Sequence, residues 1–283
     1  MIELKNISYV YSKDSPFETA ALSDVTLSIG EGEFVGIIGH TGSGKSTLVN
    51  IMGGIVKPTG GRVYIDGEDI TEMKSVTKKL GGKIGVVFQY PEYQLFEETV
   101  YKDIAFGPKN LGIGADEIDK RVREAAKMTN ISEELFEKSP FELSGGQKRR
   151  VAIAGILSMK PKMLILDEPA AGLDPGGREE ILGQIKKMHS EYGITVVLVS
   201  HSMEDVAEIC EKVIVMAKGK VIKYSHMDEV FKDSTELKNN GLSVPEVTEI
   251  MSELKKAGLS VRDDIYRMDD AVSELLALYG EVR

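Results

Sequence analysis

The sequence has almost no cysteine and no excess of basic residues, and each shortage excludes a class of protein. Cys210 is the single cysteine among 283 residues, so an intramolecular disulfide is impossible. This fits a reducing compartment, where disulfides are rare. Lys and Arg number 35 against 45 Asp and Glu, which gives a formal net charge of -10. Since nucleic-acid-binding domains usually carry a basic excess, we expect no nucleic-acid partner.

Long apolar runs are also missing. No run approaches the ~18 residues that a membrane-spanning helix needs. The first five residues, MIELK, do not form a basic segment followed by an apolar one, so we expect no signal peptide. Hydrophobic residues nevertheless make up 42% of the chain, which is enough for a folded core. We therefore expect a soluble protein that could reach a membrane only through a partner.

The most informative stretch is a glycine-rich loop with the sequence GHTGSGKST at residues 39–47. Its spacing, G-x-x-x-x-G-K-[ST], is typical of a phosphate-binding loop. An apolar run at 34–38 predicts a buried strand before the loop, and apolar residues at 48, 49, 51 and 52 predict a helix after it. Glycines let a backbone approach an anion, and the N–H groups of the loop and the helix start can cradle phosphates. The alternative is a plain glycine turn beside a lysine.

This context predicts that the whole loop binds a nucleotide. Lys45 is placed to reach the β- and γ-phosphates, and the Ser46 hydroxyl to ligate Mg²⁺. The residues that we assign to the loop site are Gly39, His40, Thr41, Gly42, Ser43, Gly44, Lys45, Ser46 and Thr47.

Further buried strands are predicted at 84–88, 163–168 and 195–199, and polar residues stand at their ends. Strands that alternate with helices indicate a parallel sheet, which binds ligands at the carboxyl ends of its strands. We therefore predict an α/β fold of the P-loop NTPase type with one shared site. The residues that follow or end these strands are Gly39, Gln89, Asp167, Glu168 and His201.

Other parts of the chain show residue patterns that differ from the alternating strands and helices of the core. Alternation at 2–11 and 25–29 predicts an antiparallel β subdomain near the nucleotide. A helical subdomain is predicted at 92–160, where the helix 116–128 turns Ile118, Val122, Ala125 and Ala126 inward. We assign an ATPase domain to 1–225 and a C-terminal extension to 226–283. In the extension we expect a helix over 245–256 with proline in its first turn, and a last helix capped by Asp269 or Asp270.

Five pieces occur in one order: the loop at 39–47, Gln89, LSGGQ at 143–147, LILDE at 164–168 and His201. In this order they resemble the ATP-binding-cassette (ABC) ATPase family over residues 1–225. LSGGQ is the most discriminating piece, because many P-loop proteins lack it and a chance match is very improbable at ordinary residue frequencies. Taken alone, it is also a glycine turn that starts a helix. The resemblance implies the ABC fold, with a mainly parallel core sheet, an N-terminal antiparallel β subdomain and an inserted helical subdomain.

The resemblance also implies a head-to-tail dimer with two ATP molecules at the interface. Each ATP would lie between the phosphate loop of one subunit and the LSGGQ segment of the other. The start of the helix at LSGGQ supports this, because its N–H groups form a second anion site. The residues that the partner would contribute are Ser144, Gly145, Gly146 and Gln147.

Roles in hydrolysis follow from the same resemblance. Glu168 resembles the general base that deprotonates the attacking water, with a surface salt bridge as its alternative role. Asp167 should hold Mg²⁺ or its water, with a strand-end turn as the alternative. Gln89 is placed to contact Mg²⁺ or that water, and His201 to hydrogen-bond the γ-phosphate. The predicted ligands are therefore ATP and Mg²⁺.

Two further residues are assigned by resemblance. Asp174, at the end of AGLD at 171–174, matches the loop that crosses to the partner subunit. Tyr11 is the candidate for stacking on adenine, and ordinary strand packing is its alternative role.

Within the family, FQYPEYQLF at 88–96 and DIAFGPKN at 103–110 resemble the ATPases of energy-coupling factor (ECF) transporters. Those transporters import vitamins or cobalt and nickel ions. The implied protein is a peripheral ATPase motor at the cytoplasmic face of the cell membrane. Its partners would be a second ATPase subunit (itself or a paralogue), a membrane-embedded coupling subunit and a substrate-binding membrane subunit.

The same resemblance suggests two contact surfaces. We expect acids after Gln89 to help dock a helix of a membrane subunit, namely Glu92, Glu97 and Glu98. Solvated surface acids are the alternative. The C-terminal extension resembles one that helps ECF ATPases to dimerise. We expect an apolar face of the last helix to make that contact, with packing on its own subunit as the alternative; it comprises Val272, Leu275, Leu276 and Tyr279.

Two other functions stay open at this point. A soluble ABC ATPase acting on DNA or the ribosome usually carries a long coiled-coil insertion or two cassettes, whereas this chain has one cassette, no long heptad run and an acidic balance. A P-loop kinase or GTPase would not need LSGGQ or His201. A shared fold alone does not decide among these functions.

Overall fold

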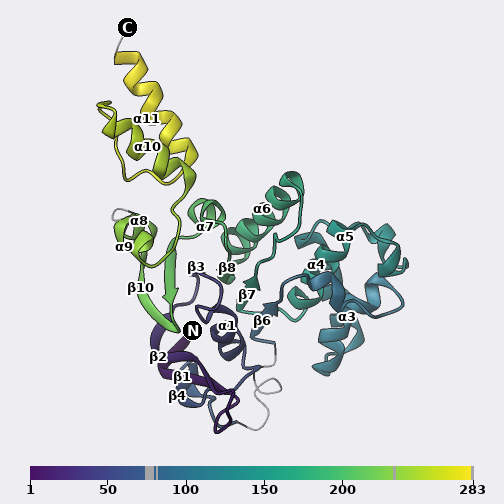
Figure 1. Cartoon of the computed structure of the whole chain (residues 1–283). Coiled ribbons are helices and arrows are strands. Elements are labelled where there is room, and N and C mark those ends of the chain that lie inside the picture. Colours follow the sequence, from purple (N-terminus) through teal and green to yellow (C-terminus); the bar gives the residue numbers. More distant parts are fainter. Residues whose placement is uncertain (74–79, 81, 232–233, 282–283) are drawn as a thin grey trace.

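The computed structural model describes residues 1–73, 80, 82–231 and 234–281. Two β-sheets with helices around them form the molecule (Figure 1). The smaller sheet has the strand order β2-β1-β4-β5, with β1 at Ile2–Tyr11, β2 at Thr19–Ile29, β4 at Gly60–Ile65 and β5 at Glu68–Asp69. The larger sheet has the order β10-β9-β3-β8-β7-β6, with β3 at Phe34–Gly39, β6 at Ile84–Val87, β7 at Met163–Asp167, β8 at Thr195–Val199, β9 at Lys212–Ala217 and β10 at Lys220–His226.

The larger sheet is the core of the fold. Its strands β9, β3, β8, β7 and β6 are parallel, and β10 closes one edge as an antiparallel hairpin. Alternate residues of β3 enter different apolar clusters, Phe34 and Ile38 in one and Val35 and Ile37 in the other. Burial on both faces explains why these strands are continuous apolar runs. Because the strands are parallel, the ends of β3, β8, β7 and β6 line up along one edge.

The smaller sheet is antiparallel, which confirms the predicted β subdomain. β2 begins at Thr19, earlier than the predicted strand at 25–29. The extra residues pair with β1, where Thr19 lies opposite Tyr11 and Leu22 opposite Tyr9. Cross-strand pairing therefore extends a strand that the local pattern indicates only in part.

A mainly helical region lies between β6 and β7 and stands to one side of the core sheet (Figure 1). Within α4, Val122, Ala125 and Ala126 are buried as predicted, and Ile118 is partly buried against the same cluster. The helices of this region are η1 at Pro91–Gln94, α3 at Val100–Asn110, α4 at Ala115–Met128, η2 at Glu133–Leu135, η3 at Pro140–Glu142 and α5 at Gly145–Leu157. The helices that pack around the core sheet are α1 at Lys45–Met52, α6 at Pro175–Tyr192 and α7 at Met203–Ile209.

The C-terminal residues form two parts. α8 at Met227–Phe231 and α9 at Ser234–Asn239 stay near the core sheet, whereas α10 at Glu246–Lys256 and α11 at Met268–Glu281 project from it (Figure 1). α10 and α11 pack on each other around a small cluster of their own, which includes Met251 and Ile265.

Two predicted helix starts are wrong by one or two residues. Pro245 is the N-cap of α10 rather than a residue of its first turn. α11 begins at Met268, so Asp269 and Asp270 lie in its first turn and do not cap it. Their negative charges still favour this helix end through the helix dipole.

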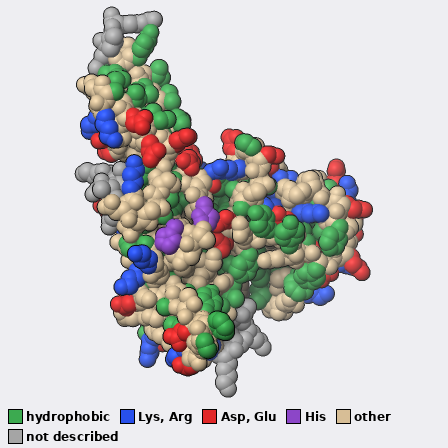
Figure 2. All heavy atoms as spheres, in the orientation of Figure 1, with side chains coloured by type: hydrophobic (Ala, Val, Ile, Leu, Met, Phe, Trp, Pro, Cys, Tyr) green, Lys and Arg blue, Asp and Glu red, His purple; other side chains and the backbone are tan. Residues whose placement is uncertain are grey.

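The predicted apolar face of α11 is divided between two surfaces. Leu275 packs against the small cluster with α10, whereas Val272, Leu276 and Tyr279 are exposed, Leu276 by 65%. The spacing of the exposed residues places them on one stripe of the helix. Figure 2 shows apolar side chains along this projecting arm. Among the described helices, none combines the length and apolarity that crossing a membrane requires.

Candidate functional site

The phosphate loop lies between β3 and α1, as predicted. β3 ends at Gly39 and α1 begins at Lys45. Gly44 has a left-handed backbone with φ of 104°, and a Cβ there would lie 2.7 Å from the carbonyl oxygen of Ala21. A Cβ on Gly39 would lie 2.5 Å from the carbonyl oxygen of Met216. Only glycine therefore fits these two positions of the tight turn.

Lys45 is buried at the base of the loop. Its Nζ donates hydrogen bonds to the carbonyl oxygens of Gly39 at 2.6 Å and His40 at 3.2 Å. Burial lowers the pKa of the Lys45 ammonium, and the charges of Glu168 and Asp167 oppose that lowering. Backbone carbonyls thus hold the ammonium where it can exchange them for phosphate oxygens, as the lysine of a phosphate loop does.

Asp167 and Glu168 lie at the end of β7. Glu168 has a left-handed backbone with φ of 52°, which costs a non-glycine residue about 1–2 kcal/mol. Its backbone N–H donates to the carbonyl oxygen of Val199 at 2.9 Å, which fixes this turn against β8. Burial, and then the charge of Glu168, raise the pKa of Asp167, while a hydrogen bond from Ser46 opposes the rise. A strained backbone beside a carboxylate with a raised pKa is typical of a functional site.

Side chains from three neighbouring strand ends meet at Glu168. Gln89 follows β6, and its Nε2 donates to one carboxylate oxygen of Glu168 at 3.2 Å. His201 follows β8, and its Nε2 lies 2.7 Å from the other oxygen. The His201 side chain is 49% exposed, so a ligand can reach this group. The motifs predict a separate role for each residue, but they do not predict these direct contacts.

The residues expected to hold Mg²⁺ fit that ion. The Ser46 hydroxyl lies close enough to the Asp167 carboxylate to oppose the rise in its pKa, and both groups are hard oxygen donors. Within the described residues, no group of three or more His, Cys, Asp or Glu could hold a metal by itself. Mg²⁺ usually binds one or two protein groups together with substrate phosphates. Ser46 and Asp167 are therefore the residues that would hold it, and the predicted third ligand, Gln89, contacts the adjacent Glu168.

The LSGGQ segment begins α5 with a capping box. Ser144 Oγ accepts a hydrogen bond from the N–H of Gln147 at 3.3 Å, and Gln147 Oε1 accepts one from the N–H of Ser144 at 3.0 Å. This arrangement fixes the helix start and leaves the Ser144 hydroxyl hydrogen for an outside acceptor. Ser144 and Gly145 are exposed, and α5 lies in the helical region to the side of α1 (Figure 1). The two anion-binding helix starts thus lie in different parts of one chain.

Tyr11 and Asp174 lie in positions compatible with their predicted roles. The Tyr11 hydroxyl is hydrogen-bonded to Thr47 Oγ1 at 3.0 Å, and its partly exposed ring lies edge-on to Tyr9. This places a partly exposed aromatic ring beside α1. Asp174 is the N-cap of α6, where its side chain accepts from the N–H of Gly177 at 2.8 Å. The cap fixes the chain just after residues 171–174.

Arg149 is a residue that the motifs did not single out. It lies on α5 and is only 2% exposed. Its guanidinium forms a bidentate pair with Glu92 at 2.7 and 3.0 Å, and donates to the carbonyl oxygens of Pro169 at 3.0 Å and Ala171 at 2.9 Å. One buried cation thus connects the LSGGQ helix to the segments that follow Gln89 and Glu168. The sequence gives one indication that Arg149 is buried: it lies one helical turn before Ile153, on the same face of the helix.

Glu92 was predicted to help dock a helix of a membrane subunit, but it pairs with Arg149 instead. Its side chain is 16% exposed because it lies against Arg149. Burial raises the pKa of Glu92, but the hydrogen bonds from Arg149 outweigh this effect, so the pKa is below its ordinary value. The expectation that Glu92 offers a free carboxylate to a membrane subunit is therefore wrong. Glu98 is exposed, although it pairs with Lys102.

Known proteins resemble this chain over nearly its whole length. A model of the ABC transporter family matches residues 22–171. The chain is 54% identical to the energy-coupling factor transporter ATP-binding protein EcfA2 of Caldanaerobacter subterraneus subsp. tengcongensis, over 97% of this chain and 96% of the relative. It is 52% identical to the protein of the same name from Clostridium tetani, over 99% of this chain and 97% of the relative.

Solved structures share the fold. cbiO1 from Clostridium perfringens, part of the ABC transporter complex cbiONQ, is 41% identical with a TM-score of 0.75, over 89% of this chain and 98% of that one. The dimeric ATP-binding cassette MJ0796 bound to ADP and Pi is 36% identical with a TM-score of 0.71, over 80% and 98%. The geometry of the site and the extent of these matches lead to one conclusion: this chain belongs to the ABC transporter family, in its branch of energy-coupling factor transporter ATP-binding proteins.

Proposed function

We propose that this protein is the ATP-hydrolysing motor of an ECF importer and works as one half of an ATPase dimer. The observation that carries the proposal is the convergence of Gln89 and His201 on Glu168, beside the phosphate loop. The relatives are named as ECF transporter subunits, which favours this function over an ATPase of DNA or the ribosome and over a kinase or GTPase.

The geometry supports the following hydrolysis step. The loop N–H groups and Lys45 bind the β- and γ-phosphates, and Mg²⁺ when bound offsets their negative charge. Glu168 accepts a proton from a water whose oxygen attacks the γ-phosphorus, and the bond to the bridging oxygen of ADP breaks. Gln89 and His201 hold the carboxylate and can orient the water and the γ-phosphate. ADP, phosphate and a proton are the products.

The second half of each site would come from the partner subunit. Ser144 to Gln147 point an exposed helix start outward, and on the same chain this start lies in a different region from the phosphate loop. A dimer would bring the two together, and the similar cassette MJ0796 is dimeric when bound to ADP and Pi. The partner would be a second copy or a paralogue.

ATP-dependent dimerisation of two single variants tests the composite site. Ser144→Arg should leave ATP binding to the phosphate loop intact but prevent ATP-dependent dimerisation, because the larger cation blocks the helix start. Ser132→Arg, at the exposed cap of η2, is the matched control and should dimerise normally. Dimerisation of Ser144→Arg at the wild-type ATP concentration would rule out this site.

A groove of the helical region is suited to a membrane subunit. It encloses about 1020 Å³ and is lined by residues of α3, α5 and the segment before α3, including Phe96 and Phe106. These two rings pack edge to face at 4.8 Å and stay partly exposed. The backbone N–H groups of Phe96 and Glu97 donate to the buried Asp103, which fixes the rim. An apolar groove of this kind fits a short helix with apolar anchors.

The groove is connected to the ATP site through the chain itself. η1 begins directly after Gln89 and Tyr90 and leads to Phe96 at the groove. A shift of Gln89 on hydrolysis would therefore move the groove first. This supports a peripheral protein at the cytoplasmic face of the membrane, bound to a membrane-embedded coupling subunit that acts with a substrate-binding subunit. We propose import of a vitamin or a transition-metal ion as the class of transport.

The exposed stripe of α11 supports a second contact, independent of ATP. Val272, Leu276 and Tyr279 lie on a projecting arm, and an apolar patch of this kind is typical of a protein–protein contact. We propose that it binds the second ATPase subunit.

A further inference from the structure

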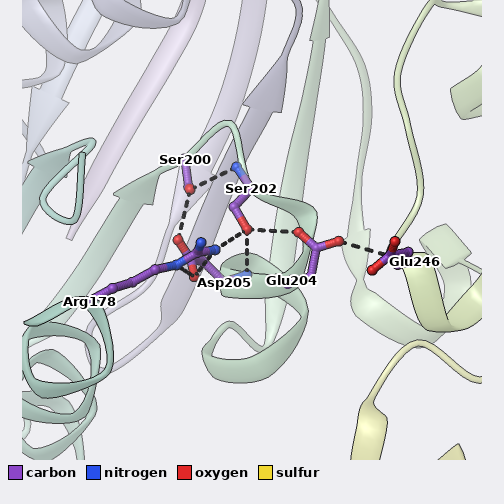
Figure 3. A network of polar contacts seen from close by, with 6 residues as sticks. All are labelled: Arg178, Ser200, Ser202, Glu204, Asp205 and Glu246. Atoms are coloured by element: carbon purple, nitrogen blue, oxygen red, sulfur yellow. Dashed lines mark hydrogen bonds and ion pairs between the residues drawn. The ribbon is translucent and has the colours of Figure 1, made fainter. Parts of the chain in front are cut away.

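A polar network surrounds the loop that carries His201 (Figure 3). Ser202 is its centre, because Ser202 Oγ accepts hydrogen bonds from Arg178 Nη2 at 2.5 Å and from the N–H of Asp205 at 3.1 Å. The same hydroxyl donates to the carboxylate of Glu204 at 2.9 Å. The residue after His201 is therefore held by three groups at once.

The residue before His201 belongs to the same network. Ser200 Oγ donates to Asp205 Oδ2 at 3.3 Å and accepts from the N–H of Ser202 at 3.1 Å. The other oxygen of Asp205 accepts from Arg178 Nε at 2.7 Å. Asp205 is buried, and each of its carboxylate oxygens has a partner. Ser200 thus contacts the buried carboxylate of Asp205 directly, and Ser202 is linked to it through Arg178.

We propose that Arg178 and Asp205 are positioning residues for ATP hydrolysis, which hold residues 200–202 so that His201 stays against Glu168. The inference rests on the proposed role of His201 in hydrolysis. His201 Nε2 lies 2.7 Å from Glu168. The His201 ring is half exposed, so the backbone of residues 200–202 largely determines its position. A displacement on the order of 1 Å at a reacting group can cost ~10²-fold in rate.

The network also reaches two other parts of the molecule. Arg178 lies in the first turns of α6, which Asp174 caps, so it joins the predicted interface loop to the His201 loop. Glu204 uses its second oxygen to accept the N–H of Glu246, the first residue of α10, at 3.3 Å (Figure 3). A shift of the C-terminal arm would therefore reach Ser202 through a single side chain.

The competing explanation is that Arg178 and Asp205 only join α6 to α7. The chain offers a matched control for this. Lys186 and Glu208 also form an ion pair between α6 and α7, at 3.9 Å, but both are exposed and do not contact residues 200–202 in any interaction found in the described structure. Glu208→Gln therefore removes an α6–α7 ion pair and leaves the His201 loop alone.

Steady-state ATP hydrolysis by the full-length protein gives the first test. We expect Asp205→Asn to lower kcat by ~10–100-fold and to leave KM for ATP within about twofold, because the phosphate loop is unaffected. Glu208→Gln should match the wild type. A folded Asp205→Asn variant with wild-type kcat would overturn the proposal. If Asp205→Asn does not fold, Ser202→Ala removes the central hydroxyl alone and should lower kcat in the same way.

Nuclear magnetic resonance of the histidine rings gives a test that is independent of turnover. The chain has four histidines, so His201→Ala identifies the His201 signal. Asp205→Asn should shift that signal and Glu208→Gln should not; an unmoved signal in Asp205→Asn would contradict a positioning role. Glu204→Ala should also shift it if the arm is linked to the loop. A different result would contradict the proposed role of His201 in hydrolysis: hydrolysis of ATP by His201→Ala at the wild-type rate.

Discussion

The pair of Arg149 and Glu92 yields the sharpest prediction about stability. Glu92→Gln removes the negative charge and leaves the guanidinium of Arg149, 2% exposed, without its ionic partner. Breaking a buried ion pair in this way costs about 3–5 kcal/mol. At about 2–4 °C of melting temperature for each kcal/mol, we expect Glu92→Gln to unfold about 6–20 °C lower than the wild type.

The pH dependence of this effect has a definite sign. The pKa of Glu92 is lowered in the folded protein, so the pair contributes stability above the unfolded pKa of about 4.3. That contribution is lost as the pH falls through the lower folded pKa. The difference in melting temperature between wild type and Glu92→Gln should thus be full at pH 7 and should shrink only in acid below pH ~4.

Thermal unfolding followed by circular dichroism measures both effects. Glu98→Gln, in the exposed pair with Lys102, is the control and should unfold like the wild type, because exposed pairs contribute little. The double variant Glu92→Leu with Arg149→Met should recover part of the loss, since it leaves no unpaired buried charge. The reasoning is refuted if Glu92→Gln melts at the wild-type temperature, or if the difference grows on acidification.

Three further predictions concern binding. Lys45→Ala should weaken ATP binding, measured by calorimetry, because it removes the cation that faces the phosphates; unchanged affinity would contradict the site. Phe106→Ser should abolish co-purification with membrane subunits while ATP binding persists, whereas Tyr192→Ser, exposed on α6, should not; retained assembly would exclude the groove. Leu276→Lys should reduce association of nucleotide-free subunits in sedimentation, whereas Ile250→Lys, exposed on α10, should not; equal association would exclude the exposed stripe of α11 as the contact.

The sequence was most informative where local pattern and site coincide. Each parallel strand of the core is a short apolar run, and the polar residue after it was visible in the chain order. Parallel pairing then places Gln89, Glu168 and His201 at one edge without any further information. The N-cap and capping box of α5 follow equally from local spacing, because Ser144 and Gln147 are three residues apart.

Contacts between distant segments could not be predicted in this way. Arg149 and Glu92 are 57 residues apart, and nothing in either local pattern indicates the other. The apolar face of α11 shows the same limit, because periodicity finds its apolar residues but only the position of α10 decides that Leu275 is inside and Leu276 outside. Tertiary structure likewise shows that Val230, Phe231 and Leu242, which lie in the predicted C-terminal extension, belong to the main core, so point variants test the arm better than removal of the whole extension.

Glu168→Gln tests the central claim most directly. The amide is nearly isosteric with the carboxylate but does not accept the proton of the attacking water, and loss of a general base costs ~10²–10⁴-fold in rate. ATP affinity and ATP hydrolysis should be measured on the same assembled complex, with sedimentation to detect the ATP-bound dimer. We predict wild-type affinity, loss of most turnover and accumulation of the closed dimer. Hydrolysis near the wild-type rate by Glu168→Gln would contradict the assignment of Glu168 as the base.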